Sequence, residues 1–450
     1  MTVADGVVDL VTGDPYDAWL ALRAVGLLRD FNRAGVVSAA DVHVAQTLGR
    51  LGEESDERVL LALALAVRGV RLGSVCVVLD DIRRAVAPDD AETGGDALAW
   101  PDATDWRAAC AASPLDAVGD GDGGDVADHL GRPLRLVDDL LYLDRYWRQE
   151  EVVRTELDAR AQRGGPVVDV GAVRDGLARL FPASAPDRQR LAATMTVLRY
   201  DSIIAGGPGT GKTTTVARLI ALLRSLPGDM PRVALAAPTG KAAARLQEAV
   251  TAESSASGLG LGDVTASTLH RLLGWRPGSR NHFIHDRANR LPYDVVVVDE
   301  SSMVSLTLMS RLLEAVRPDA RLVLVGDPDQ LASVEAGAVL GDLVARSAAP
   351  GQHSPALLGE LVGADLAPGE QSSDEVRNGV VRLTQTHRFG HAIGALAAAI
   401  QDDDADRVLG LLRSGDEAMS FIESADDAVL GRDQVAGLRS DVVATARALG

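Results

Sequence analysis

Cysteine, aromatic residues and lysine are all scarce in this 450-residue sequence. The only two cysteines, Cys76 and Cys110, have no partners at metal-ligand spacing and are too few to hold a chain of this size together by disulfide bonds. Such usage is typical of a reducing compartment, so we predict a cytoplasmic location. No stretch approaches the roughly 20 apolar residues of a membrane span, and the N-terminus lacks the pattern of an export signal, so we expect no membrane partner.

The basic residues are 43 arginines and two lysines, Lys212 and Lys241. They are outnumbered by 64 acidic residues, and the net charge of -19 at first argues against a polyanionic ligand. The charge is uneven, however: residues 1–150 sum to -13, residues 151–300 to +4 and residues 301–450 to -10. Salt screens surface charges within about 8–10 Å, so the local sign matters more than the total. A nucleic-acid site in the middle third is therefore compatible with the composition.

The chain is long enough for about three domains, and its 46% hydrophobic and 24% charged residues are ordinary for a folded globular protein. Residues 1–163 carry apolar side chains at helical spacing, which predicts an α-helical N-terminal domain. The segment 140–147 is rich in aromatic residues for this chain, and we expect it to be a helix that closes this domain.

From residue 200 onwards, short apolar runs alternate with helical patterns. The runs cover residues 202–205, 233–237, 295–298 and 322–325. This alternation predicts an α/β domain, at 167–347, with a parallel sheet covered on both faces. Ligands of such sheets bind at the carboxyl ends of the strands. We expect residues 348–378 to form a connecting loop and residues 379–450 to begin another domain.

The first apolar run leads into a phosphate-binding loop of the pattern G-x-x-x-x-G-K-[ST], followed by a predicted helix at 214–223. Glycines let backbone N–H groups curl around a phosphate, Lys212 reaches the β and γ phosphates, and Thr213 ligates Mg²⁺. About 0.002 matches are expected by chance in a chain of this composition. The predicted nucleotide-binding residues of this segment are Gly206, Gly207, Pro208, Gly209, Thr210, Gly211, Lys212, Thr213 and Thr214.

Two later runs end in polar residues that suit hydrolysis of a bound nucleotide. The third run ends in Asp299, which we assign to Mg²⁺, and Glu300, which we assign as the general base for the attacking water. A capped strand end is the alternative for an isolated acidic pair. The fourth run leads to Gln330, a neutral side chain suited to sensing the γ-phosphate.

The second run ends in another loop-to-helix turn, which contains Thr239 and the second lysine, Lys241. It lacks a full phosphate-loop pattern. Its small residues and compact ammonium group suit contact with a nucleic-acid backbone. A solvated helix start is the alternative that these residues leave open.

These segments, in this order, resemble the RecD family, the alpha chains of exodeoxyribonuclease V, within the superfamily 1 helicases. The matching segments are residues 206–216, 237–246, 268–273, 298–304 and 325–337. The resemblance implies a P-loop NTPase (RecA-like) domain behind an α-helical N-terminal domain that docks onto a partner subunit, and an incomplete second RecA-like domain. It also implies that Gln189 reads the adenine, that Arg388 reaches the γ-phosphate as an arginine finger does, and that Thr239, Lys241, His270 and Arg271 line the path of the DNA strand.

The function implied by the resemblance is that of an ATP- and Mg²⁺-dependent 5′-3′ DNA helicase or translocase subunit in double-strand-break repair and recombination. Its expected partners are single-stranded DNA from a duplex end and RecB-like and RecC-like subunits. Two further motifs of the family are not found in residues 390–450. We therefore expect a C-terminally truncated chain that does not unwind DNA alone, and the alternative is an ATP-binding assembly or regulatory subunit without helicase activity of its own.

Overall fold

The computed structural model describes residues 18–85, 98–116, 132–182, 186–258, 260–262, 264–276, 283–330, 336–337, 339–347, 355–384, 391–416, 419, 421 and 432–448. The chain forms two compact units. The first consists of Met1–Gly206 and Lys212–Leu383, and the second of Gly207–Gly211 and Thr384–Gly450.

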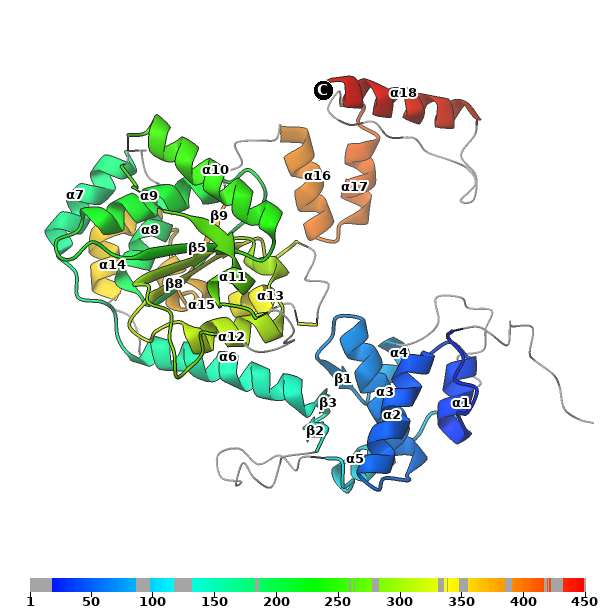
Figure 1. The fold of residues 1–450 in the computed structure, drawn as a ribbon. Coiled ribbons are helices and arrows are strands. Elements are labelled where there is room, and N and C mark those ends of the chain that lie inside the picture. The colour runs from blue at the N-terminus through cyan, green and yellow to red at the C-terminus, as the bar shows by residue number, and fades with distance from the viewer. Residues whose placement is uncertain are drawn as a thin grey trace, which may run out of the picture. The chain divides into compact units, whose positions relative to one another are not determined.

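The N-terminal part of the first unit is built around one buried helix, α3 (Figure 1). The side chains of Leu61, Leu63 and Leu65 in α3 are almost fully buried, because neighbouring helices and a small sheet enclose the helix. Trp106 packs into the same core and donates its indole N–H to the carbonyl oxygen of Arg58 at 2.7 Å. The helices of this part are α1 (Gly26–Arg33), α2 (Ala39–Leu51), α3 (Glu57–Arg71), α4 (Ile82–Ala85) and α5 (Ala103–Ala111).

This part also contains an antiparallel three-stranded sheet, which the prediction of an α-helical N-terminal domain did not include. The strands are β1 (Cys76–Val78), β2 (Leu134–Val137) and β3 (Leu140–Leu143), in the order β1-β3-β2. The segment 140–147, predicted as a helix, begins as strand β3, and helix α6 (Asp144–Gln162) starts only at its fifth residue. Residues 140–143 pair with β2 in a hairpin and with β1, which lies more than 60 residues earlier, and helical periodicity does not show either pairing.

The buried carboxyl group of Asp116 makes the stability of this part depend on pH. Burial raises the pKa of Asp116 to about 6, although the carboxyl accepts the backbone N–H of Leu136 at 2.9 Å. The folded state therefore binds more protons than the unfolded state between about pH 4 and pH 6, and stability falls as pH rises through this window.

Substitution of Asp116 by asparagine keeps the hydrogen-bond acceptor and removes the titration. We expect the variant to be more stable than the wild type at pH 7, by about 1–3 kcal/mol, and equally stable at pH 4. Urea denaturation at both pH values measures this difference. The exchange Asp138→Asn, at an exposed position, is the control. An equal effect of Asp116→Asn at both pH values would contradict the burial argument.

The larger part of the first unit is a six-stranded parallel sheet with the strand order β6-β5-β7-β8-β4-β9. The strands are β4 (Asp201–Gly206), β5 (Val233–Ala237), β6 (Ala266–Thr268), β7 (Val295–Val298), β8 (Arg321–Gly326) and β9 (Val380–Leu383). Four of them contain the four apolar runs of the sequence, which confirms the predicted α/β fold.

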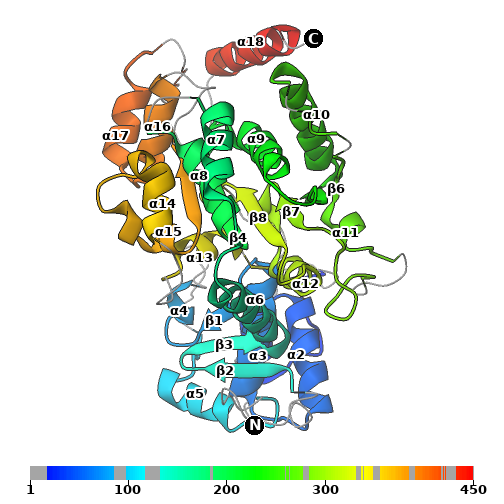
Figure 2. The same cartoon turned by 90° about the vertical axis from the view of Figure 1, so that its left-hand side faces the viewer.

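Two layers of helices cover the two faces of this sheet (Figures 1 and 2). Successive side chains of a strand point to opposite faces, so Val295 and Val297 join one core while Val296 and Val298 join the other. The first core is completed by α7 (Val170–Leu180), α8 (Arg188–Leu198), α9 (Lys212–Ser225), α10 (Gly240–Ala256) and α14 (Pro355–Val362). The second is completed by α6, α11 (Leu269–Leu272), α12 (Leu306–Ala315) and α13 (Val339–Ala345).

The predicted boundary of this domain at residue 347 was too early. Within the expected connection 348–378, helix α14 packs on the first core and α15 (Asp374–Arg377) leads into β9. Strand β9 pairs with β4 in parallel, so residues 380–383 belong to the first sheet and not to a second domain. Gly379 makes the approach possible, because a Cβ there would lie 2.9 Å from the carbonyl oxygen of Asp201.

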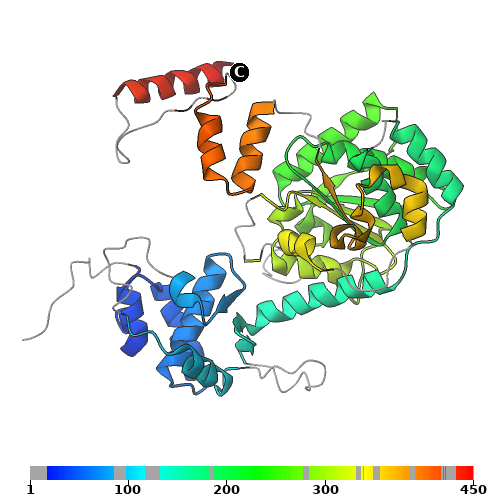
Figure 3. The same cartoon turned by 180° about the vertical axis from the view of Figure 1, so that it is seen from behind.

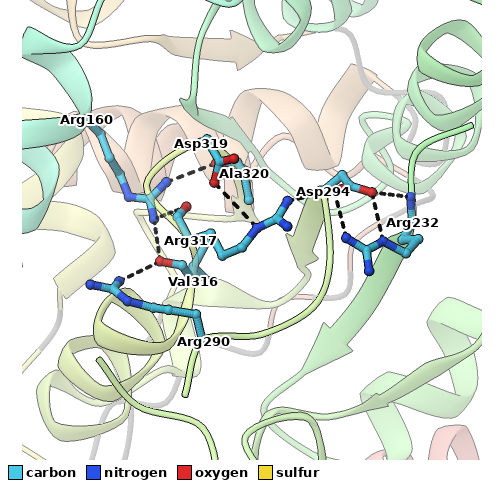
Figure 4. Close-up of polar contacts among 8 residues, drawn as sticks. All are labelled: Arg160, Arg232, Arg290, Asp294, Val316, Arg317, Asp319 and Ala320. Carbon is cyan, nitrogen blue, oxygen red and sulfur yellow. Dashed lines mark hydrogen bonds and ion pairs between the residues drawn. The ribbon is translucent and has the colours of Figure 1, made fainter. Parts of the chain in front are cut away.

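Helix α6 leaves the N-terminal part and packs along α12 (Figure 3). Near its end, the buried guanidinium group of Arg160 donates to the carbonyl oxygens of Val316, Arg317 and Ala320, each at 3.0 Å (Figure 4). These carbonyls follow α12, where the helix dipole favours a cation. Arg290 donates to Val316 as well, at 2.8 Å. Arg160 thus fastens α6 to the segment between α12 and β8 of the six-stranded sheet.

We expect Arg160→Met to lower the free energy of unfolding by about 2 kcal/mol, because the exchange removes three hydrogen bonds from a charged donor. The carbonyl of Ala320 loses its side-chain donor, whereas Val316 keeps Arg290 and Arg317 keeps the N–H of Ala320. Urea denaturation followed by circular dichroism measures this loss. Arg154→Met on the same helix removes an exposed ion pair with Glu151 and should cost less than about 1 kcal/mol. Equal unfolding midpoints for the two variants would contradict the proposed stabilisation by the Arg160 hydrogen bonds.

The second unit contains three described helices, α16 (His391–Gln401), α17 (Ala405–Leu412) and α18 (Arg432–Ala448). Helices α16 and α17 pack against each other. Among the described residues, no helix is both long and apolar enough to cross a membrane.

Candidate functional site

The phosphate-binding loop joins β4 to α9, as the sequence predicts. Gly209 and Gly211 have φ angles of 78° and 84°, a conformation that favours glycine. The hydroxyl of Thr210 is buried and donates to the carbonyl oxygen of Gly207 at 2.8 Å. Lys212 opens helix α9, and its amino group donates to the carbonyl oxygen of Gly206. The predicted residues Pro208, Thr213 and Thr214 lie in the same loop and first helical turn.

Asp299 follows β7, and its carboxyl group has a perturbed pKa. Burial raises the pKa of the Asp299 carboxyl to about 6, and the charge of Glu300 adds to this effect. The backbone N–H of Glu300, donating at 3.0 Å, and the nearby ammonium group of Lys212 oppose it. The structure therefore places the phosphate-loop lysine and the predicted metal ligand close enough to interact.

Glu300 occupies a left-handed conformation, with φ 52° and ψ 42°. This conformation costs a non-glycine residue roughly 1–2 kcal/mol, and such strain gathers at functional sites. The turn is held by the backbone N–H of Asp299, which donates to Ala236, and by the hydroxyl of Ser301, which donates to Val298. Glu300 is half-buried in this turn.

Strand β8 ends beside this turn. A Cβ on Gly326 would lie 3.2 Å from the backbone nitrogen of Ser301, so the last residue of β8 has to be small. Asp327 follows and is buried, and Gln330 lies exposed at the end of the turn, with its backbone N–H donated to Asp327. Gln330 follows β8 and Asp299 follows the neighbouring strand β7, so the two residues lie at the same edge of the sheet.

Gln189 lies in the first turn of α8 and is half-buried. The preceding residue, Arg188, donates to the carbonyl oxygen of Arg382 in β9 at 2.9 Å. The neighbouring β9 residue, Leu383, is in register with Gly206 at the start of the phosphate loop. The first turn of α8 is therefore near the end of β4, as an adenine-reading role requires.

The four residues predicted to contact DNA lie at the other end of the same edge. Thr239 caps α10, and its hydroxyl accepts the backbone N–H of Ala242. Lys241 follows in the first turn of α10 and is exposed. His270 and Arg271 lie in α11, directly after β6, and are also exposed. Strands β5 and β6 are neighbours, so these two pairs of residues emerge side by side.

The carboxyl edge of the sheet thus has two halves. Thr239, after β5, and Gly206, at the end of β4, are separated by three strand spacings, or about 14 Å. Asp299 and Glu300 lie between them, after β7. Arg388, the predicted arginine finger, lies outside the described residues.

Sequence reasoning passed over two residues at this edge. Asp327 comes directly after a buried strand, as Asp299 does, and this position in the sequence could have identified it as a candidate site residue. Trp275, close behind α11, is a large exposed aromatic residue in a chain with five tryptophans. Among the described residues, no group of three or more histidine, cysteine or acidic side chains is arranged to hold a metal ion.

Two family models match the chain. Residues 33–142 match the RecBCD enzyme subunit RecD, N-terminal domain, and residues 189–336 match an AAA domain. The curated RecBCD enzyme subunit RecD of Mycobacterium tuberculosis is 51% identical over 423 residues, which are 92% of this chain and 64% of that protein. The same subunit of Mycolicibacterium smegmatis is 49% identical over 86% of this chain and 62% of its own length.

More distant proteins match parts of the chain. The ATP-dependent RecD2 DNA helicase of Deinococcus radiodurans is 47% identical over 33% of this chain and 18% of that protein. The crystal structure of the Pif1 helicase from Candida albicans covers 58% of this chain and 55% of that chain, at 17% identity and a TM-score of 0.30, too low for any argument.

This chain spans less than two thirds of the length of its mycobacterial relatives. Within that span the identity is high, the model of the RecD N-terminal domain matches the helical part, and the phosphate loop and acidic pair lie where the sheet topology requires. The chain belongs to the RecD family.

Proposed function

We propose that the chain is the ATP-dependent 5′-3′ DNA helicase or translocase subunit of a RecBCD-type helicase-nuclease that acts in double-strand-break repair and recombination. One observation carries the proposal. Lys212 and Asp299 lie close together at the carboxyl edge of a parallel sheet, and that same edge presents Lys241, His270 and Arg271 to solvent. A site for a nucleotide and a site for a polyanion therefore share one rigid edge.

In this proposal the half of the edge around β4 binds ATP as substrate. The ammonium group of Lys212 binds the phosphates, and the backbone N–H groups at the start of α9 add positive potential. Gln189 contacts the adenine. The carboxylate of Glu300 accepts a proton from the attacking water, and the amide of Gln330 contacts the γ-phosphate. Arg388 would stabilise charge on the γ-phosphate.

The oxygen donors of the site fit Mg²⁺. Thr213 supplies a hydroxyl and Asp299 a carboxylate, the kinds of ligand that this hard cation prefers. The raised pKa of Asp299 fits too, since a half-buried carboxylate that lacks a full counter-charge would be stabilised by a cation. Mg²⁺ bound there would neutralise phosphate charge.

The N-terminal part is proposed to dock onto a RecC-like subunit, and the complex also to contain a RecB-like subunit. Large apolar side chains exposed on this part would supply apolar contacts to such a partner. They are Trp19, Leu22, Val25, Leu51 and Leu72. We also propose the domain organisation predicted from the sequence: an N-terminal docking part, a first RecA-like ATPase domain and the start of a second one. A subunit that acts on chromosomal DNA would work in the cytoplasm.

Unwinding by an assembled complex tests the proposal. The chain would be combined with RecB-like and RecC-like subunits and given a duplex with a 5′ single-stranded tail. We expect unwinding that depends on ATP and is lost on this substrate with Lys212→Ala. A complex that forms normally and unwinds the tailed duplex equally well with Lys212→Ala would favour the assembly role over the helicase role.

A further inference from the structure

A loop beside the proposed DNA contacts exposes two large apolar side chains. Trp275 is 45% exposed and Ile284 is 43% exposed, and they lie at the two ends of the loop that follows α11. Exposed apolar side chains of this size, next to each other in the fold, commonly mark a binding surface. Trp275 lies four residues beyond Arg271, and Ile284 is hydrogen-bonded to the residues just before Trp275, so both lie at the proposed nucleic-acid half of the sheet edge.

The backbone holds both ends of this loop in place. The N–H of Trp275 donates to the carbonyl oxygen of His270 at 2.8 Å, and the N–H of Ile284 donates to Leu273 and Gly274 at 3.1 Å. Gly274 has φ 72°, and a Cβ there would lie 2.8 Å from the Cβ of Ile284, so the close approach needs a glycine. The indole is therefore presented by a fixed backbone.

An aromatic neighbour also orients His270. The ring of Phe283 lies 6.0 Å from the His270 ring, with an angle of 50° between the planes. Phe283 itself packs on the second core. His270 and Trp275 therefore belong to one backbone segment, which is held against the second core.

Charge around the loop favours a polyanion. Residues 264–276 contain two arginines and no acidic residue, in a chain whose net charge is -19. Arg271 and Arg276, which flank the exposed indole in sequence, are both exposed. Cations that track a phosphate backbone, combined with an aromatic face, are the usual elements of a site for single-stranded nucleic acid.

We propose that Trp275 is a stacking platform for a base of the translocated single strand, with Arg271 and Arg276 paired to the flanking phosphates. The inference rests on the proposed function, because it assumes that single-stranded DNA binds at this edge. Stacking on Trp275 adds a contact to the bases, whereas Thr239, Lys241 and Arg271 contact the DNA backbone. Every base offers an aromatic face, so such a contact tolerates any sequence.

Binding of oligothymidylate and of an abasic strand of equal length tests the stacking role, with the 450-residue chain and fluorescence anisotropy. Trp275→Ala should bind oligothymidylate at least about fivefold more weakly than the wild type and bind the abasic strand equally well. Trp275→Phe should retain most of the affinity. The salt dependence should not change with Trp275→Ala, whereas Arg271→Ala should reduce its slope by about 0.7.

Met230→Ala is the matched control, because Met230 is 71% exposed but precedes β5, at the opposite edge of the sheet. It should leave both affinities unchanged. Wild-type affinity of Trp275→Ala for oligothymidylate, or an equal loss on both strands, would overturn the stacking role and leave the proposed function standing. A wild-type chain that binds neither strand would overturn both.

Discussion

Replacing Lys212 by alanine is expected to lower the rate of ATP hydrolysis by about 10²–10³-fold, the usual effect of losing one preorganised donor to developing charge. The expectation follows from the position of its amino group, which is at the end of β4 and interacts with the Asp299 carboxylate. Steady-state phosphate release measures the rate. Thermal unfolding of the variant should match the wild type, since the side chain is only half-buried.

Two further variants separate charge from geometry. Lys212→Arg keeps the charge but replaces a compact ammonium by a planar guanidinium, and we expect it to be nearly as slow as Lys212→Ala. Arg218→Ala removes a cation from the same helix, where its partner is Glu253, and should stay within about twofold of the wild type. Full activity of Lys212→Ala would show that the loop does not bind the reacting phosphates.

Replacing Glu300 by glutamine is expected to slow hydrolysis by about 10²–10⁴-fold and to leave nucleotide affinity unchanged. The amide has the shape of the carboxylate but cannot accept the proton of the attacking water. Single-turnover hydrolysis measures the chemical step, and binding of a fluorescent nucleotide measures affinity. Asp299→Asn should instead weaken binding that depends on Mg²⁺, because this residue is the proposed metal ligand.

Glu248→Gln serves as the control for this experiment. Glu248 is an exposed residue of α10, and its replacement should leave the rate unchanged. If Glu300→Gln hydrolysed ATP at the wild-type rate, another group would have to be the general base, and the assignment of the acidic pair would be wrong.

Local sequence patterns predicted the four central strands of the parallel sheet, for a physical reason. A strand buried on both faces is a continuous apolar run, and the runs at 233–237 and 295–298 coincide with β5 and β7. Phosphate loops likewise need glycine and lysine at fixed spacing, so the spacing alone was enough to assign Gly209, Gly211 and Lys212 to the loop.

The errors arose where distant segments decide the conformation. Strand β9 is four residues long and contains an arginine, so only its pairing with β4 identifies it as part of the sheet. Residues 140–143 look helical but pair with β1 and β2. Trp275 gave no periodic signal, and its significance lies in its exposure, which sequence alone does not reveal.

DNA-stimulated ATP hydrolysis is the most direct test of the idea that one sheet edge joins nucleotide hydrolysis to strand binding. The rate would be measured for the wild type and for Lys212→Ala, with and without single-stranded DNA. We predict that single strands accelerate the wild type and that Lys212→Ala is slow in both conditions. A wild-type rate that is indifferent to DNA would contradict the account and indicate a P-loop NTPase that acts on another substrate.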